Sequence, residues 1–150
     1  MTSTEHNGGA PLLSVKDLRV YFHGDDTVSR AVDGVDFTVE PRETVCLVGE
    51  SGCGKTVSAL AVLGLVPMPP GRIEQGRIDF AGSNLLQLDE EALRKIRGNR
   101  IAMVFQEPLT SLNPVFTIED QISEAIRVHH PASEVELRRR CVELLHDVGI

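Results

Sequence analysis

Residues 49–56 read Gly-Glu-Ser-Gly-Cys-Gly-Lys-Thr and complete the pattern G-x-x-x-x-G-K-[S/T], whose residue types suit the binding of a polyphosphate. Such a ligand needs neutralising charge and many hydrogen-bond donors in a small space. Glycines let the backbone fold around an anion with its N–H groups pointing inward. Lys55 can reach the β- and γ-phosphates, and the hydroxyl of Thr56 can coordinate Mg²⁺. The pattern therefore predicts a loop that binds a nucleoside triphosphate.

The segments on either side of this loop predict the strand and the helix that would position it. Val45–Val48 is an apolar run without alternation, which is typical of a strand buried on both faces, and Cys46 within it is expected to act as a small buried hydrophobe. Val57–Val66 is apolar and compatible with a helix, which Pro67 would close. A helix that starts in the loop points its positive end at the phosphates.

The N-terminal part of the chain predicts an antiparallel pair of strands. Leu13–Phe22 alternates apolar and polar residues with one phase slip near Lys16-Asp17, where a bulge is expected. A turn over His23–Thr27 leads to a second alternating run at Val35–Val39. Because both runs alternate, we expect one face of the pair to be exposed to water.

Further along the chain, the sequence predicts two more strands and three more helices. The strands are Gly76–Phe80 and the unbroken apolar run Ile101–Phe105. One helix is expected to begin at Asp89 and to end at Gly98. Thr117 is expected to cap a second helix, and the spacing of Ser133 and Glu136 predicts a capping box for a third.

Composition limits the classes of function. The chain has 150 residues, a net charge of −7 and 41% hydrophobic residues, which suit one globular domain. The acidic balance argues against nucleic acid and anionic membrane surfaces as partners. The run Val57–Val66 is too short to span a bilayer. The polar segment Met1–Pro11 is expected to be disordered and shows no export signal. Three cysteines without paired spacing fit a reducing compartment, so a cytoplasmic location is expected.

A family resemblance narrows the prediction. Residues 101–121, which read I-A-M-V-F-Q-E-P-L-T-S-L-N-P-V-F-T-I-E-D-Q, closely resemble the Q-loop region of ATP-binding subunits of ABC importers for dipeptides, oligopeptides and nickel. The loop at residues 49–56 and the opening L-R-V-Y-F-H-G-D-D-T-V-S-R-A-V-D-G-V-D-F resemble the same group. The resemblance runs from Leu12 to Ile150.

This resemblance implies roles for individual residues. Phe22 matches the aromatic residue that stacks on adenine, with Tyr21 as the neighbour that could be confused with it; without the family, a core aromatic closing a strand is an equal alternative. Gln106 matches the glutamine that coordinates Mg²⁺ or the attacking water and senses the membrane subunit. Lys55 would stabilise charge on the γ-phosphate. The loop residues expected to bind nucleotide are Gly49, Glu50, Ser51, Gly52, Cys53, Gly54, Lys55 and Thr56, with Thr56 and Gln106 as Mg²⁺ ligands.

The implied fold is an α/β P-loop NTPase core of the ABC ATPase type with an antiparallel β subdomain and the start of a helical subdomain. A tail at residues 1–11 precedes the β subdomain and P-loop core at 12–106, and the Q-loop and helical start follow at 107–150. The signature loop, the Walker B strand and the switch histidine of the family do not occur in these residues. We therefore expect the N-terminal portion of such a subunit, which alone folds poorly and does not hydrolyse ATP.

The implied function is ATP binding and hydrolysis, with ATP and Mg²⁺ as cofactors, to power import of peptides or nickel. The expected partners are transmembrane permease subunits and a second ATP-binding subunit, with the protein held peripherally on the inner face of the cell membrane and no nucleic acid bound. Two other classes stay open: a P-loop kinase for small molecules, which needs an acceptor site and a lid, and a soluble ABC ATPase of DNA repair or translation.

Overall fold

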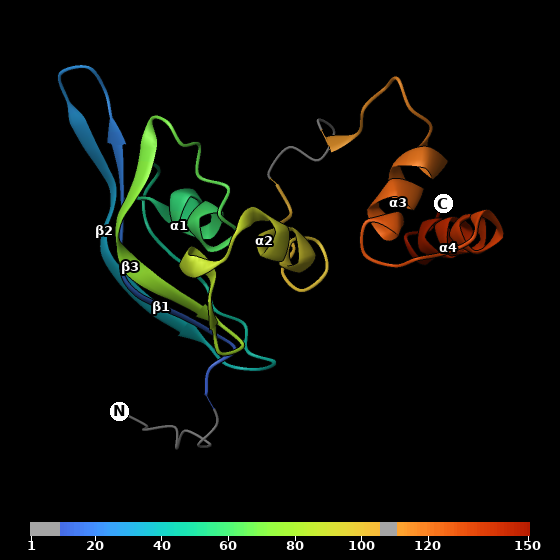
Figure 1. Cartoon of the computed structure of the whole chain (residues 1–150), viewed down its shortest axis with the longest axis horizontal. Helices are drawn as coiled ribbons and strands as arrows, with labels where there is room; N and C mark the ends of the chain where they lie inside the picture. Colours follow the sequence, from blue (N-terminus) through green and yellow to red (C-terminus); the bar gives the residue numbers. More distant parts are fainter. Residues whose placement is uncertain (1–9, 106–110) are drawn as a thin grey trace. The chain divides into compact units, whose positions relative to one another are not determined.

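The computed structural model describes residues 10–105 and 111–150 (Figure 1). The chain folds into two compact units, residues 1–93 and 94–150. Of the predicted tail, Ala10 and Pro11 alone belong to the described residues. The predicted boundary between residues 106 and 107 lies outside them.

The first unit is built on a four-stranded antiparallel sheet with the order β2-β1-β3-β4 (Figure 1). The helix α1 (Lys55–Val62) contacts β1 and β2 and closes a small core against the sheet. The strands are β1 (Leu13–His23), β2 (Val28–Val39), β3 (Gly71–Phe80) and β4 (Ser83–Asn84), followed by the 3₁₀ turn η1 (Leu85–Gln87). The buried apolar side chains of this unit are those of Val15, Leu18, Val20, Val32, Ala61, Val62, Leu63, Val66, Ile78, Phe80 and Leu85.

The predicted pair of N-terminal strands and its bulge are confirmed. The β1–β2 register shifts between Val15 and Leu18, and Asp17 between them has a φ of 43°. On the neighbouring strand β3, Gly76 has a φ of 128°, and a β-carbon there would lie 2.8 Å from Cα of Leu18. The bulge therefore needs a glycine on the adjacent strand as well as the phase slip in β1.

Several predicted boundaries differ from those observed: β2 begins at Val28 rather than Val35, and α1 begins at Lys55 rather than Val57. The helix α1 ends at Val62 rather than Val66, because Gly64 takes a φ of 62° and its N–H bonds the carbonyl oxygen of Ala61, which ends the helix before Pro67 is reached. The strand β3 begins at Gly71 rather than Gly76, because its first half pairs with the end of β1.

The strand predicted at Val45–Val48 is wrong, since these residues have no strand pairing. Val48 is 92% exposed, and Cys46, predicted to be buried, is exposed. The strand predicted at Ile101–Phe105 is also wrong: Ile101 makes one isolated bridge with Arg97, and Val104 is 92% exposed. Both segments have the apolar composition of central strands, but among the described residues no strand pairs with either, and a strand needs a hydrogen-bonded neighbour.

The predicted capping residues Asp89, Thr117 and Ser133 are confirmed, whereas the carboxylate of Glu136, expected to complete a capping box, accepts from Arg139. The side chain of Asp89 accepts from the N–H of Ala92 at the start of α2 (Glu90–Ile96). Thr117 caps α3 (Ile118–Arg127) and Ser133 caps α4 (Glu134–Asp147), each by accepting from the N–H three residues on, at 3.1 and 3.3 Å. In the second unit α3 packs against α4, where Leu137 and Cys141 are buried. No helix among the described residues is long and apolar enough to cross a bilayer.

The exposed apolar segments predict that residues 1–150 alone self-associate. Val48→Lys with Val104→Lys should raise the monomer fraction in light scattering after gel filtration, because charge opposes contact between unpaired strand-like segments. Val28→Lys is the control, because Val28 is also exposed but lies in the paired strand β2. A monodisperse monomer formed by the unmodified chain would contradict this prediction.

Candidate functional site

The loop at residues 49–56 is shaped by two glycines with left-handed backbone conformations. Gly52 has a φ of 82° and Gly54 a φ of 90°, a region that other residues rarely adopt. Gly54 is also buried against β2, where a β-carbon would lie 2.2 Å from the carbonyl oxygen of Ala31. The missing side chain therefore fixes the start of α1 directly against the sheet.

The start of α1 differs chemically from the starts of the other α-helices. Gly54 is its N-cap and offers no side-chain acceptor, and its first turn contains no acidic residue. By contrast, α2, α3 and α4 each have a capping side chain and acidic residues in the first turn. Within residues 10–105 and 111–150, no side chain thus caps the first N–H groups of α1 or places a negative charge in its first turn, which suits an anionic ligand.

Lys55 curls back over the loop. Its ammonium nitrogen donates to the carbonyl oxygens of Gly49 at 2.8 Å and Glu50 at 2.7 Å, and it lies 3.4 Å from Sγ of Cys53. Within α1, the hydroxyl of Ser58 donates to the carbonyl oxygen of Gly54 at 3.0 Å and ties the first turn of the helix to the loop. The cationic group therefore lies among the residues of the predicted phosphate loop.

Thr56, the predicted Mg²⁺ ligand, is the second residue of α1 and has an exposed side chain. Ser51 and Cys53 are also exposed. An exposed hydroxyl beside an ammonium group and an uncapped helix start is a set of groups that fits a Mg²⁺–polyphosphate complex, since Mg²⁺ binds both hydroxyl and phosphate oxygens.

The two candidate aromatic residues at the end of β1 have different surroundings. The hydroxyl of Tyr21 donates to Asp33 at 2.7 Å, and the guanidinium of Arg30 lies 5.5 Å from the centre of its ring. The hydrogen bond from Tyr21, assisted by the nearby arginines, holds the pKa of Asp33 below its usual value. Phe22 is half-buried and pairs with Gly71 of β3. Tyr21 is therefore engaged by its neighbours in the sheet, whereas the ring of Phe22 is partly exposed at the end of β1.

In the second unit, the structure adds a residue that the sequence analysis missed. The side-chain amide of Gln121 donates to the carbonyl oxygens of Asn113 at 3.0 Å and Phe116 at 3.1 Å, and its oxygen accepts from the N–H of Asn113 at 2.9 Å. Gln121 thus holds the loop before α3 in place. Its position one turn after the capping Thr117 is the signal that could have indicated this role. Gln106, predicted to bind Mg²⁺, lies outside the described residues.

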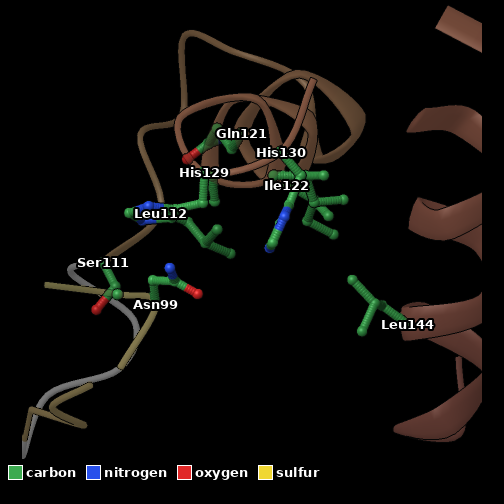
Figure 2. Close-up of a pocket in the computed structure, with 11 residues that line it drawn as sticks. Asn99, Ser111, Leu112, Gln121, Ile122, His129, His130 and Leu144 are labelled. Atoms are coloured by element: carbon green, nitrogen blue, oxygen red, sulfur yellow. The ribbon is translucent and has the colours of Figure 1, made fainter. Parts of the chain in front are cut away.

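A cavity of about 420 Å³ also lies in the second unit (Figure 2). Its walls are mostly apolar, and two histidines are the only basic side chains among the described residues that line it. It therefore lacks the charge that a polyphosphate needs. The residues that line it are Gly98, Asn99, Ser111, Leu112, Gln121, Ile122, Ala125, Ile126, His129, His130 and Leu144. Among the described residues, no group of three or more His, Cys, Asp or Glu side chains could hold a metal ion.

The chain was compared with known proteins. The family model described as "ABC transporter" matches residues 32–150. The chain belongs to the ABC transporter family. It is 47% identical over 139 residues to the probable peptide ABC transporter ATP-binding protein y4tR of Sinorhizobium fredii, covering 93% of this chain and 42% of that protein. It is 52% identical over 140 residues to the peptidoglycan transport ATP-binding protein YejF of Agrobacterium fabrum, covering 93% of this chain and 26% of that protein. This ABC family chain thus spans less than half the length of these curated relatives.

The fold also matches solved ABC structures. The dimeric structure of the ATP-binding cassette MJ0796 in a post-hydrolysis state, bound to ADP and Pi, aligns with a TM-score of 0.76 at 23% identity, over 89% of this chain and 56% of that chain. The mixed α/β fold of the ABC ATPase, predicted from the resemblance, is confirmed.

The contact of Gly54 with β2 predicts a stability difference between two glycines of the loop. In a complete ABC domain containing this sequence, Gly52→Ala should lower the free energy of unfolding by about 1–2 kcal/mol, the strain of a left-handed backbone. Gly54→Ala should lower it by about 1–3 kcal/mol more, because a methyl group meets the carbonyl oxygen of Ala31 in packed surroundings. Urea unfolding measures both. Equal losses of stability in the two variants would mean that the space around Gly54 accommodates a methyl group.

Proposed function

We propose that residues 49–56, together with Phe22, bind Mg-ATP in the ATP-binding subunit of an ABC importer for peptides. The observation that carries this proposal is the geometry of the loop. Gly54 presents an uncapped helix start, and the ammonium of Lys55 lies beside it within the loop. Backbone N–H groups and one cation in this arrangement suit the β- and γ-phosphates of a nucleotide.

Different residues of the chain would bind the phosphates, the metal ion and the base. The N–H groups of the loop bind and orient the phosphates, and Lys55 stabilises the charge that develops on the γ-phosphate. Thr56 and Gln106 would hold Mg²⁺, which when bound would supply positive charge that offsets the negative charge of the phosphates. Phe22 offers a ring for the base to stack on.

The names of the relatives support peptides as the transported class. y4tR is named as a probable peptide transporter subunit, and YejF as a peptidoglycan transport subunit. Both names describe transport, which favours an importer over a soluble ABC ATPase of DNA repair or translation. Membership of the ABC family argues against a small-molecule kinase.

The proposal includes partners and a location. ATP-binding subunits of importers act on permease subunits in the membrane, so we place the protein peripherally on the inner face of the cell membrane. A second ATP-binding subunit is the other proposed partner, which the dimeric state of the similar cassette structures supports.

Lys55→Ala tests the phosphate site. In a complete ABC domain, Mg-ATP at about 100 times its Kd should stabilise the wild type by roughly 2.7 kcal/mol. Lys55→Ala should lose this gain, because it removes the ammonium group that lies in the loop, while Lys16→Ala, at an exposed lysine of β1, should keep it. Thermal unfolding with and without Mg-ATP measures the effect. Equal shifts in wild type and Lys55→Ala would refute the role of Lys55.

Phe22→Ala tests the base site. It should weaken ATP binding by about 1–3 kcal/mol, the scale of base–aromatic stacking, and leave the binding of tripolyphosphate, which has no base, unchanged. Phe37→Ala is the matched control, because Phe37 is also a half-buried phenylalanine in a strand of the same sheet. Calorimetric titration of both ligands measures the difference. A lower stability without a change in ATP affinity would indicate that Phe22 packs in the core and does not bind the base.

A further inference from the structure

Gly71, the first residue of β3, lies directly opposite Phe22 of β1. A β-carbon at Gly71 would lie 3.1 Å from Cε1 of Phe22, 2.7 Å from the carbonyl oxygen of Pro67 and 2.8 Å from Cγ1 of Val66. The φ of Gly71 is not in the left-handed region, so any residue could adopt its backbone conformation. The lack of space for a side chain, rather than the backbone conformation, therefore requires a glycine here.

Two of these three neighbours are held in place. The N–H of Gly71 donates to the carbonyl oxygen of Pro67 at 2.9 Å. Beside it, the N–H of His23 at the end of β1 donates to the carbonyl oxygen of Pro70 at 3.0 Å. Val66 is 4% exposed and belongs to the core. Phe22, in contrast, is only half-buried near the end of its strand. A side chain at Gly71 would meet all three groups, most closely Pro67 and Val66, and the ring of Phe22 at 3.1 Å is the group with the most room to move.

We propose that Gly71 is a positioning residue for nucleotide binding: its missing side chain lets the ring of Phe22 lie down over β3 in the orientation that accepts a purine base. This inference rests on the proposed function of Phe22. An aromatic ring that covers a glycine on the neighbouring strand is a recognised way to fix a strand pair. Tyr21 cannot replace Phe22 as the stacking ring, because it is held by Asp33 and Arg30.

The test uses a complete ABC domain and two ligands, Mg-ATP and tripolyphosphate. Gly71→Ala should raise the Kd for ATP about fivefold or more, within the range of base stacking, and leave the Kd for tripolyphosphate within about twofold. Gly24→Ala is the matched control, because a β-carbon there meets Oγ1 of Thr27 at an ordinary 3.4 Å, and neither Kd should change. The double variant Phe22→Ala with Gly71→Ala should bind ATP as Phe22→Ala does, because the effect of Gly71 acts through the ring.

The outcomes separate the two proposals. If Phe22→Ala keeps the ATP affinity of the wild type, the stacking function fails, and the role of Gly71 fails with it. If Phe22→Ala loses affinity but Gly71→Ala does not, the inference about Gly71 alone is overturned. Equal loss of both ligands in Gly71→Ala would also overturn it, because that result indicates a general structural role.

A second variant guards against misfolding. Val66→Ala removes the methyl group 2.8 Å from the added β-carbon, so Gly71→Ala in a Val66→Ala background has more room. Compared with Val66→Ala alone, the combined variant should show the same selective loss of ATP affinity. If its ratio of ATP to tripolyphosphate affinity equals that of Val66→Ala, the positioning role is refuted.

Discussion

The contact between Gly54 and the carbonyl oxygen of Ala31 is the constraint on which the rest of the candidate site depends. It sets the first turn of α1 against β2 at a separation that leaves no space for a β-carbon. Because the loop runs directly into that turn, the position of the sheet determines where the loop's N–H groups point. The antiparallel strands are thus part of the phosphate site, although none of their side chains contacts the loop through a hydrogen bond among those described.

The parts of the fold that depend on local chemistry could be predicted from the sequence. The phase slip near Asp17 and the caps at Thr117 and Ser133 were predicted and are confirmed, because each follows from neighbouring residues. The strands at Val45–Val48 and Ile101–Phe105 were not correct, because strand formation depends on hydrogen-bonded partners that composition does not reveal.

The candidate site was predictable to a similar extent. The loop residues and Lys55 follow from a contiguous pattern, and the structure brings them together. The roles proposed for Gly71 and Gln121 could not be predicted in the same way. Gly71 matters because of atoms from Val66, Pro67 and Phe22 that converge in space, and Gln121 because its amide matches carbonyl groups in the preceding loop. The surroundings of Gly71 leave no periodic or compositional mark in the sequence, and the local signal for Gln121 is its position one turn after the capping Thr117.

The two hydrogen bonds from Lys55 to its own loop have a consequence for binding thermodynamics. A long, free lysine side chain loses up to about 2 kcal/mol of rotamer entropy when it is fixed. Here the ammonium is already held at 2.8 and 2.7 Å by Gly49 and Glu50, so this entropy is lost on folding and not on association. A phosphate group that arrives exchanges one set of oxygen acceptors for another. The heat of binding should therefore reflect the difference between carbonyl and phosphate acceptors, with only a small contribution from ordering the lysine.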